Sequence, residues 1–361
     1  MVPSLSPVSS VSGILPRFLR GHVLSPAFSR IRRRGVLLLA LGACVVGVLA
    51  SVSPAPSEYV IEIGPIAMPA NGGHGDVDQP SPLALALPVD GWLRGLTFEL
   101  VDEKGERLPT GLLHHLNLIM PDHRELFSQI MLRIGAAGPE TRPYSLPWFL
   151  GYRVRPGDSL LVTAMLHNPT PKEYRGVRLR VQLELSPATT WLRPLAIQPL
   201  YLDVMPPAGQ HAFDLPPGRS VRSWEGRPAV AARLLAAGSH LHKYGTALRL
   251  EDISTGKVIW EAHPKIGDRG EVVGMPRRYF LPFGVLLSPD HRYRLTAEYN
   301  NPTGKVLEGG GMGALGGIVL PASGNAWPGV ERGDSVYRRD VWVTTGEGSS
   351  HHGASHHGGH H

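Results

Sequence analysis

Hydrophobic and polar residues alternate along several stretches of the chain, as they do in half-buried β-strands. The alternation is clearest in "YVIEIGPIAM" at 59–68 and in "GVRLRVQLEL" at 176–185, where apolar or β-branched residues recur at every second position. Other segments are apolar over most of their length and read as strands for that reason. These further predicted strands lie at 93–109, 110–120, 158–170, 227–252, 256–262, 292–301 and 312–321.

Turn signals recur at short spacing between these segments, and few amphipathic helices are evident. By intrinsic propensity "RPAVAARLLAAG" at 227–238 also suits a helix, so both readings stay open there. A proline-rich passage at 186–207 separates two groups of strands. We therefore predict an all-β fold with two tandem β-sandwich domains, at 58–200 and 201–345.

Composition agrees with a turn-rich β protein of two domains. The chain has 361 residues with 43 glycines and 34 prolines, and only 18% of its residues are charged. Its hydrophobic fraction of 42% is enough to bury a core, which argues against general disorder.

The formal charge of +6 comes from the N-terminal region. Six arginines and no acidic residue precede Glu58. The rest of the chain has 30 basic and 30 acidic residues. The body is thus near neutral, and its net charge gives no reason to expect nucleic acid or an anionic membrane surface as a partner. The six are Arg17, Arg20, Arg30, Arg32, Arg33 and Arg34.

Both ends of the chain differ from the body. Residues 35–52, "GVLLLALGACVVGVLASV", carry no charge and follow the arginines, so 1–57 read as a leader, either a signal peptide or an N-terminal membrane anchor. Either reading predicts an exported body, secreted or held at a membrane. The tail at 346–361, "GEGSSHHGASHHGGHH", cannot pack a core, and we expect it to be disordered.

The only cysteine, Cys44, lies within the apolar run of the leader. The body therefore has neither disulfides nor a thiolate metal site. Any soft metal ligand in the body must be a methionine.

Two histidine pairs are the candidate chemistry. His240 and His242 are one residue apart in a predicted strand, so both side chains project to the same face and could form half of a metal site. His114 and His115 are adjacent, and consecutive strand residues face opposite ways. They could bind one ion only at a strand end or a bulge. Their leucine-rich surroundings make unpaired imidazoles costly, and a metal would remove that cost.

Two further residues become candidate metal ligands because the two histidine pairs are present. His167 ends an apolar strand just before "NPT", where a lone histidine is usually a capping or surface residue. Met312 follows "EGGG" and precedes "GALGG"; most such methionines fill cores, but a thioether is also a soft ligand that favours Cu(I). The remaining body histidines read as surface residues: His74, His123, His211, His263 and His291.

The order HH, H, HxH, M resembles the copper type II, ascorbate-dependent monooxygenase family, which includes peptidylglycine α-hydroxylating monooxygenase and dopamine β-monooxygenase. The similarity runs with gaps from about Glu58 to Val343. It is carried by "LLHHLNLIM", "TAMLHNPT", "AAGSHLHKYGTALRLED" and "AEYNNPTGKVLEGGGMGALGGIVLP".

The resemblance implies two jelly-roll-like sandwiches facing each other across a cleft, with two coppers per chain. By similarity, His114, His115 and His167 would hold the copper that stores and passes an electron. His240, His242 and Met312 would hold the copper that binds O₂. Ascorbate or another reductant would supply electrons, and a C–H bond of a small organic substrate would be hydroxylated.

The body lacks the disulfides of the animal enzymes, and their substrate-contact residues cannot be placed here. Peptide and catecholamine substrates therefore do not carry over. An exported copper-binding carrier without turnover remains an alternative, as does a structural or carbohydrate-binding sandwich with scattered histidines. Nucleophilic and nucleotide-binding classes are disfavoured, because the body has no cysteine and the chain has no GxSxG elbow, P-loop or dinucleotide fingerprint.

Overall fold

The computed structural model describes residues 57–345 except 74, 191, 210, 269, 323 and 325. These residues belong to one compact unit. The predicted leader and the histidine-rich tail lie outside the described residues. No helix in the described part of the chain is both long and apolar enough to cross a membrane.

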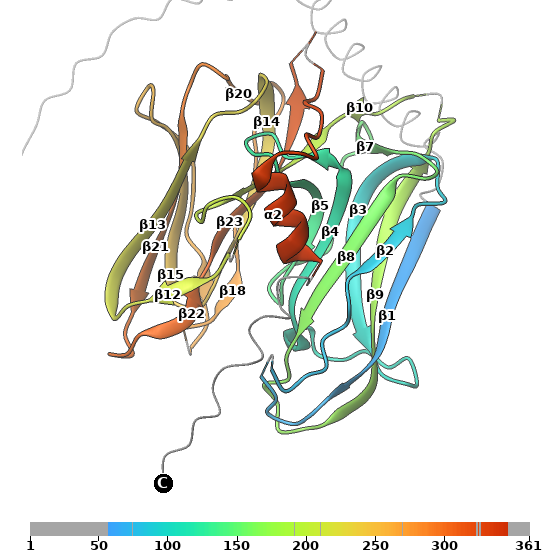
Figure 1. Cartoon of the computed structure of the whole chain (residues 1–361), viewed down its shortest axis with the longest axis vertical. Coiled ribbons are helices and arrows are strands. Elements are labelled where there is room, and N and C mark those ends of the chain that lie inside the picture. The colour runs from blue at the N-terminus through green and yellow to red at the C-terminus, as the bar shows by residue number, and fades with distance from the viewer. Residues whose placement is uncertain are drawn as a thin grey trace, which may run out of the picture. The chain divides into compact units, whose positions relative to one another are not determined.

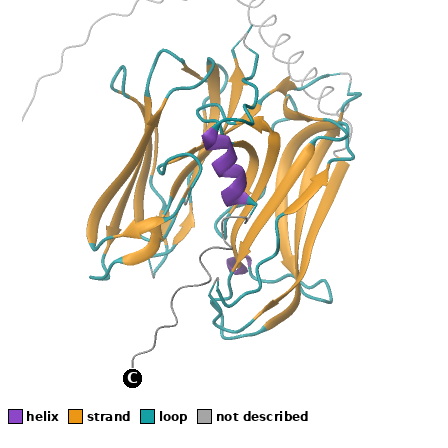
Figure 2. Ribbon diagram, viewed as in Figure 1, coloured by secondary structure: helices purple, strands orange, loops and turns teal. Residues whose placement is uncertain are grey.

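The fold is almost entirely β, as the alternating pattern predicted (Figures 1 and 2). The first sandwich has one sheet in the order β1-β9-β3-β7-β10, with β6 beside β3, and a second in the order β2-β8-β4-β5. Its strands are β1 (Ser57–Met68), β2 (Leu83–Ala86), β3 (Gly91–Val101), β4 (Leu113–Arg124), β5 (Met131–Ala137), β6 (Tyr144–Ser145), β7 (Leu150–Val154), β8 (Ser159–Leu166), β9 (Tyr174–Pro187) and β10 (Leu195–Ala196).

The second sandwich has sheets in the orders β11-β23-β14-β19, with β20 beside β14, and β13-β21-β15-β16; β12–β22 and β17–β18 form separate ribbons. Its strands are β11 (Gln198–Asp203), β12 (Phe213–Leu215), β13 (Gly218–Gly226), β14 (Ala232–Leu241), β15 (Gly245–Asp252), β16 (Lys257–Ala262), β17 (Lys265–Ile266), β18 (Val272–Gly274), β19 (Arg278–Tyr279), β20 (Val285–Leu287), β21 (Tyr293–Asn301), β22 (Leu307–Gly311) and β23 (Gly313–Pro321).

Each sandwich has its own core because each strand turns alternate residues inward. In β9, Val177, Leu179 and Val181 are fully buried, with partly exposed residues between them. Their cluster joins both sheets of the first sandwich through Ile197 and takes in Leu235 of β14, whereas Leu200 belongs to a second cluster, which fills the second sandwich and takes in Leu126 and Phe127. The chain therefore passes between sandwiches inside the proline-rich passage that the sequence marked.

The ambiguous segment at 227–238 resolves as a strand. Its second half lies in β14, which pairs with β23 over nearly its whole length. Pairing on both sides of β14, with β20 and β19 as well as β23, outweighs the helix propensity of its alanines and leucines.

One strand in each sandwich, β8 in the first and β21 in the second, leads into the same type of turn. After β8, the Asn168 amide donates to the carbonyls of Met68, Pro69 and Lys172, and its oxygen accepts from Thr170. After β21, the Asn301 amide donates to Leu215, Pro216 and Lys305, and its oxygen accepts from Thr303. The two "NPTxK" sequences thus mark a repeated element of the fold.

The helix α2 (Ser335–Thr344) was not predicted, although Asp334 caps it by accepting from the backbone N–H of Val336 and Tyr337. It docks on the first sandwich, although it follows the second in sequence (Figure 1). Asp340 accepts from both Nη atoms of Arg133 on β5, and both side chains are buried.

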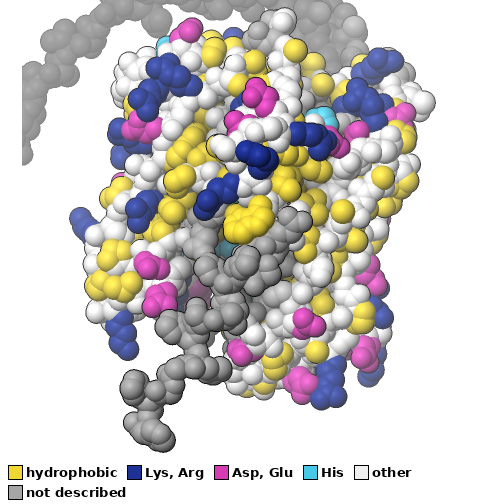
Figure 3. All heavy atoms as spheres, in the orientation of Figure 1, with side chains coloured by type: hydrophobic (Ala, Val, Ile, Leu, Met, Phe, Trp, Pro, Cys, Tyr) yellow, Lys and Arg dark blue, Asp and Glu magenta, His cyan; other side chains and the backbone are white. Residues whose placement is uncertain are grey.

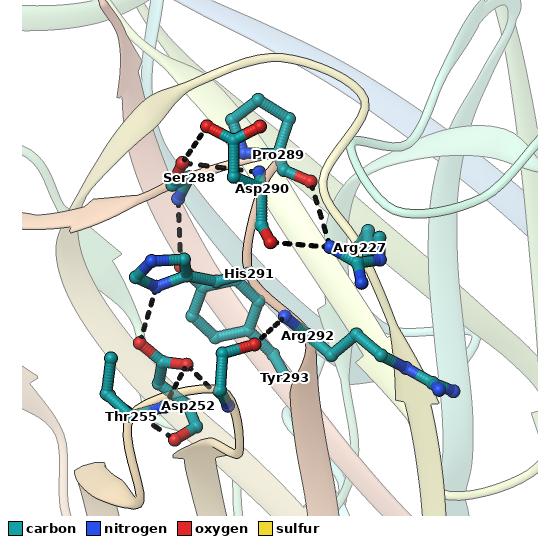
Figure 4. Close-up of polar contacts among 10 residues, drawn as sticks. Arg227, Asp252, Thr255, Ser288, Pro289, Asp290, His291, Arg292 and Tyr293 are labelled. Atoms are coloured by element: carbon teal, nitrogen blue, oxygen red, sulfur yellow. Dashed lines mark hydrogen bonds and ion pairs between the residues drawn. The ribbon is translucent and has the colours of Figure 1, made fainter.

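A second polar network closes the loops beside β21 (Figure 4). His291 Nδ1 lies 2.8 Å from a carboxylate oxygen of Asp252, and the other oxygen accepts from the backbone of Ser254. Arg227 donates to the carbonyl of Asp290. His291 therefore has a structural role in a turn.

Candidate metal centre

The first three candidate histidines meet where β4 pairs with β8. Leu113 pairs with Leu166 and His115 with Met165, so His114 is an extra residue on β4. This is the β-bulge that adjacent histidines needed in order to share a site. The backbone N–H of His167, just past β8, donates to the carbonyl of Leu112, which ties the third histidine to the same strand end.

His240 and His242 come from the end of β14. His240 pairs with Ala314 on β23, and the His242 N–H donates to the Met312 carbonyl at 3.3 Å. Their rings are 5.2 Å apart and perpendicular, on the same side of the strand as the i, i+2 spacing predicted.

All five imidazoles form one cluster. The His114 ring lies 4.1 Å from that of His115, 5.3 Å from His167 and 5.4 Å from His242. The His115 ring lies 5.2 Å from His240 and 5.6 Å from His242. One nitrogen from each of His114, His115 and His242 lies within 4.8 Å of the other two, close enough to bind a single ion.

This arrangement differs from the one that the resemblance implied. There, the first three histidines and the second pair occupy separate centres, one in each sandwich. Here one nitrogen of His242, from the second sandwich, lies within 4.8 Å of one nitrogen of His114 and one of His115, so the two sets of histidines adjoin.

Two of the histidines are held in the neutral form that binds metals. Burial, and then the neighbouring His240, lower the pKa of His242 to about 4. Burial, and then the surrounding imidazoles, hold the pKa of His115 far below its usual value. The Nε2 atoms of His240 and His242 are buried and have no hydrogen-bond partner. Such atoms are costly unless a ligand uses their lone pairs.

Glu140 also contacts the site, and the sequence analysis did not predict this contact. Its Oε1 lies 2.6 Å from Nδ1 of His240, and its side chain is 7% exposed. Burial has the largest single effect on the Glu140 carboxyl and opposes its ionisation, but the contacts with His240, together with its own backbone N–H and His242, lower its pKa overall. An Nδ1–H bound to Glu140 leaves the His240 lone pair on Nε2, as in metal-bound histidines generally.

Met312 joins the site through backbone contacts at the junction of β22 and β23. Its N–H donates to the Tyr299 hydroxyl at 2.9 Å, and that hydroxyl also accepts from His242 N. A Cβ on Gly313 would come within 2.7 Å of Ala297, so only glycine allows the strand to pack this closely. Met312 lines the same cavity as His115 and His240.

That cavity has a volume of about 280 Å³ and lies against the histidine cluster. An apolar cavity of about 150 Å³ accepts one benzene ring, so this one has room for a larger organic molecule. Small side chains on the paired strands β14 and β23 leave space for the cavity. The residues that line it there are Ala236, Ala237, Gly238, Gly316 and Gly317.

The other histidines lie apart from this cluster or at its edge. His263 is on the surface as predicted, and His74 is outside the described residues. His211 is more enclosed than predicted: its Nδ1 lies 3.1 Å from the buried Asp203, which also accepts from the Tyr201 hydroxyl at 2.6 Å and from the Met205 backbone N–H. Nothing in its loop sequence signalled that partner.

No protein-family model and no curated protein matches the chain. Among solved structures, the major capsid protein P2 of bacteriophage PM2 is similar at 13% identity with a TM-score of 0.35, over 75% of this chain and 100% of that one. PNGase F, a glycosylasparaginase from Flavobacterium meningosepticum, is similar at 9% identity with a TM-score of 0.37, over 76% and 98%. Likeness at this level carries no argument about function.

Proposed function

We propose that the chain is an exported copper-dependent monooxygenase that hydroxylates a C–H bond of an organic substrate. The observation that carries the proposal is the cluster of five imidazoles, two of which, His115 and His240, line a cavity together with Met312. Histidine clusters this dense, with two orphaned Nε2 atoms, are costly without a ligand.

The donor set fits copper. Imidazole suits copper, zinc, iron and nickel alike, but thioether sulfur is soft and favours Cu(I). By the resemblance, His114, His115 and His167 would hold one copper, and His240, His242 and Met312 the other. Copper would supply O₂ activation and one-electron transfer. One oxygen atom enters the C–H bond, and the other leaves as water with two electrons from an external reductant and two protons.

The chain's own residues have distinct parts in this scheme. Glu140 fixes the tautomer and direction of His240, and Tyr299 holds the backbone of both His242 and Met312. The cavity would place an organic substrate beside His115, His240 and Met312. Ascorbate is the reductant that the resemblance suggests.

A copper carrier is the second candidate, because His114, His115 and His242 alone can enclose one ion. The two functions are separated by O₂ consumption in the presence of ascorbate, measured on copper-loaded protein ending at residue 345 so that tail histidines do not bind metal. A monooxygenase consumes O₂ with added organic substrates, whereas a carrier binds copper and does not turn over.

Met312→Ile tests the site directly, with Met205→Ile as the matched control because Met205 packs against the second core. We expect Met312→Ile to keep its fold and most of its copper but to lose substrate oxidation, and the control to retain it. Full turnover in Met312→Ile would remove the sulfur from the mechanism, and absence of stoichiometric copper from the unmodified protein would end the proposal.

A further inference from the structure

An exposed apolar segment of the second sandwich comprises β19, β20 and the turn between them. Tyr279 is 53% exposed, Leu281 41%, Phe283 78% and Leu286 50%. Single exposed apolar residues are ordinary on protein surfaces, but four within eight residues form a continuous patch. The patch is therefore a candidate interaction surface.

Hydrogen bonds hold the backbone of this segment in place. The Phe280 N–H donates to the Leu235 carbonyl at 2.8 Å, and the Gly284 N–H donates to Phe280 at 2.7 Å. Arg233 donates to the carbonyl of Phe283 at 3.1 Å, and Gly284 has a φ of +67° that favours glycine. The exposed Phe283 ring thus stands on an ordered turn.

Three exposed arginines border the patch: Arg233, Arg277 and Arg278. Among the described residues none of these three arginines forms an ion pair with an acidic side chain, so their charge is not neutralised locally. On the face seen in Figure 3, basic and acidic side chains are interspersed. The near-neutral total charge of the body thus hides a local excess of positive charge.

We propose that residues 278–286, with Arg233 and Arg277, dock on a phospholipid surface that carries anionic headgroups. Aromatic and aliphatic side chains on a turn can enter the interfacial layer, while guanidinium groups bind the phosphates above it. The patch has both components in adjacent positions. This inference does not depend on the copper activity.

The N-terminal sequence and the fold favour a membrane over a protein partner. If residues 35–52 anchor the chain, the four residues 53–56 span at most about 14 Å, which holds Ser57 close to the bilayer. In Figure 1 the start of β1 and strand β20 lie at the same end of the molecule. Arg277 and Tyr279 also line the cavity, so docking would bring its opening to the lipid.

The test places an environment-sensitive fluorophore on a single cysteine in the full-length chain, with Cys44 replaced by alanine. The probe position is Phe283→Cys, and the matched control is Val221→Cys on β13, where the native side chain is 64% exposed. Both proteins are reconstituted into vesicles of phosphatidylcholine with one-third phosphatidylglycerol. Because the leader is the same in both, it contributes equally.

We expect the probe at 283 to shift to the blue and to be quenched several-fold more strongly by spin-labelled lipid than the probe at 221. Replacing Arg233 and Arg278 with glutamine should reduce that quenching, as should high salt. Equal signals at 283 and 221 would overturn the proposal. So would a concentration-dependent shift at 283 without lipid, which would assign the patch to a second copy of the chain. An equal response in pure phosphatidylcholine would overturn the role given to the arginines.

Discussion

Glu140 and His240 join the two sandwiches through a carboxylate–imidazole contact of 2.6 Å. Glu140 lies in the loop after β5 of the first sandwich, and His240 is on β14 of the second. The loop is held further by Arg277, which donates to the Arg142 carbonyl at 2.7 Å. The geometry of the metal centre therefore depends on how the two sandwiches meet.

Replacing Glu140 with glutamine should weaken copper binding without unfolding the protein. The amide cannot carry the negative charge that makes His240 a stronger donor, and loss of such a partner typically costs about 10- to 100-fold in metal affinity. Competition with a copper chelator measures the change. Glu106→Gln, in an exposed loop, is the control and should bind copper normally. Equal affinities in the two variants would contradict a role for Glu140.

His242 should matter more for copper binding than His167. His242 lies near both His114 and His115 and is also next to His240, so its loss disturbs both proposed ligand sets. We expect His242→Ala to lose close to two coppers per chain and His167→Ala close to one, by metal analysis and electron paramagnetic resonance. His263→Ala should lose none, because that side chain is 69% exposed. One copper lost in both cluster variants would show that His242 serves only the set with His240 and Met312.

The sequence predicted the strands well because alternation is a local property. It also gave the i, i+2 placement of His240 and His242 and the need for a bulge at His114, since both follow from strand geometry. The "NPT" turns were visible as strand ends, but their equivalence became clear only from the hydrogen bonds of Asn168 and Asn301.

Long-range features could not be read in the same way. The contact of His242 with His114 depends on how two separately formed sandwiches pack, and no periodicity encodes that. Glu140 lies in a turn with no pattern that marks a ligand partner. The helix α2 did carry a signal in its capping residue Asp334, but it is short and rich in β-branched and aromatic residues, so its docking on the first sandwich decides its conformation.

Stability should fall as the pH rises through the range in which Glu125 ionises. Burial raises the pKa of Glu125 to about 8, although backbone N–H groups of Arg133 and Tyr201 donate to it. The unfolded chain releases this proton near the usual value of 4.5, so up to about pH 8 this carboxyl binds more protons in the folded state. Below about pH 6.5 the depressed pKa values of His115 and His242 act in the opposite direction, so the unfolding free energy should decline between about pH 6.5 and 8, by about 2 kcal/mol.

Urea denaturation at several pH values measures that decline, and Glu125→Gln is the informative variant. Its absolute stability can differ, because an amide offers one acceptor where the carboxyl offers two. Its pH dependence between about 6.5 and 8 should be flatter than that of the unmodified chain. A slope that Glu125→Gln leaves unchanged would show that another group titrates there.

Asp340→Ala should be strongly destabilising, because it leaves the Arg133 guanidinium buried without its carboxylate. The two side chains are 7% and 2% exposed, and Asp340 also accepts from the backbone N–H of Met131. Breaking a buried pair by removing one partner costs about 3–5 kcal/mol. Asp122→Ala is the matched control: it removes the exposed pair of Asp122 with Arg332, where the expected cost is about 0–1 kcal/mol. Urea denaturation measures the loss of unfolding free energy in both variants. If Asp340→Ala lost as little as Asp122→Ala, α2 would detach easily and water would reach Arg133 when Asp340 is absent.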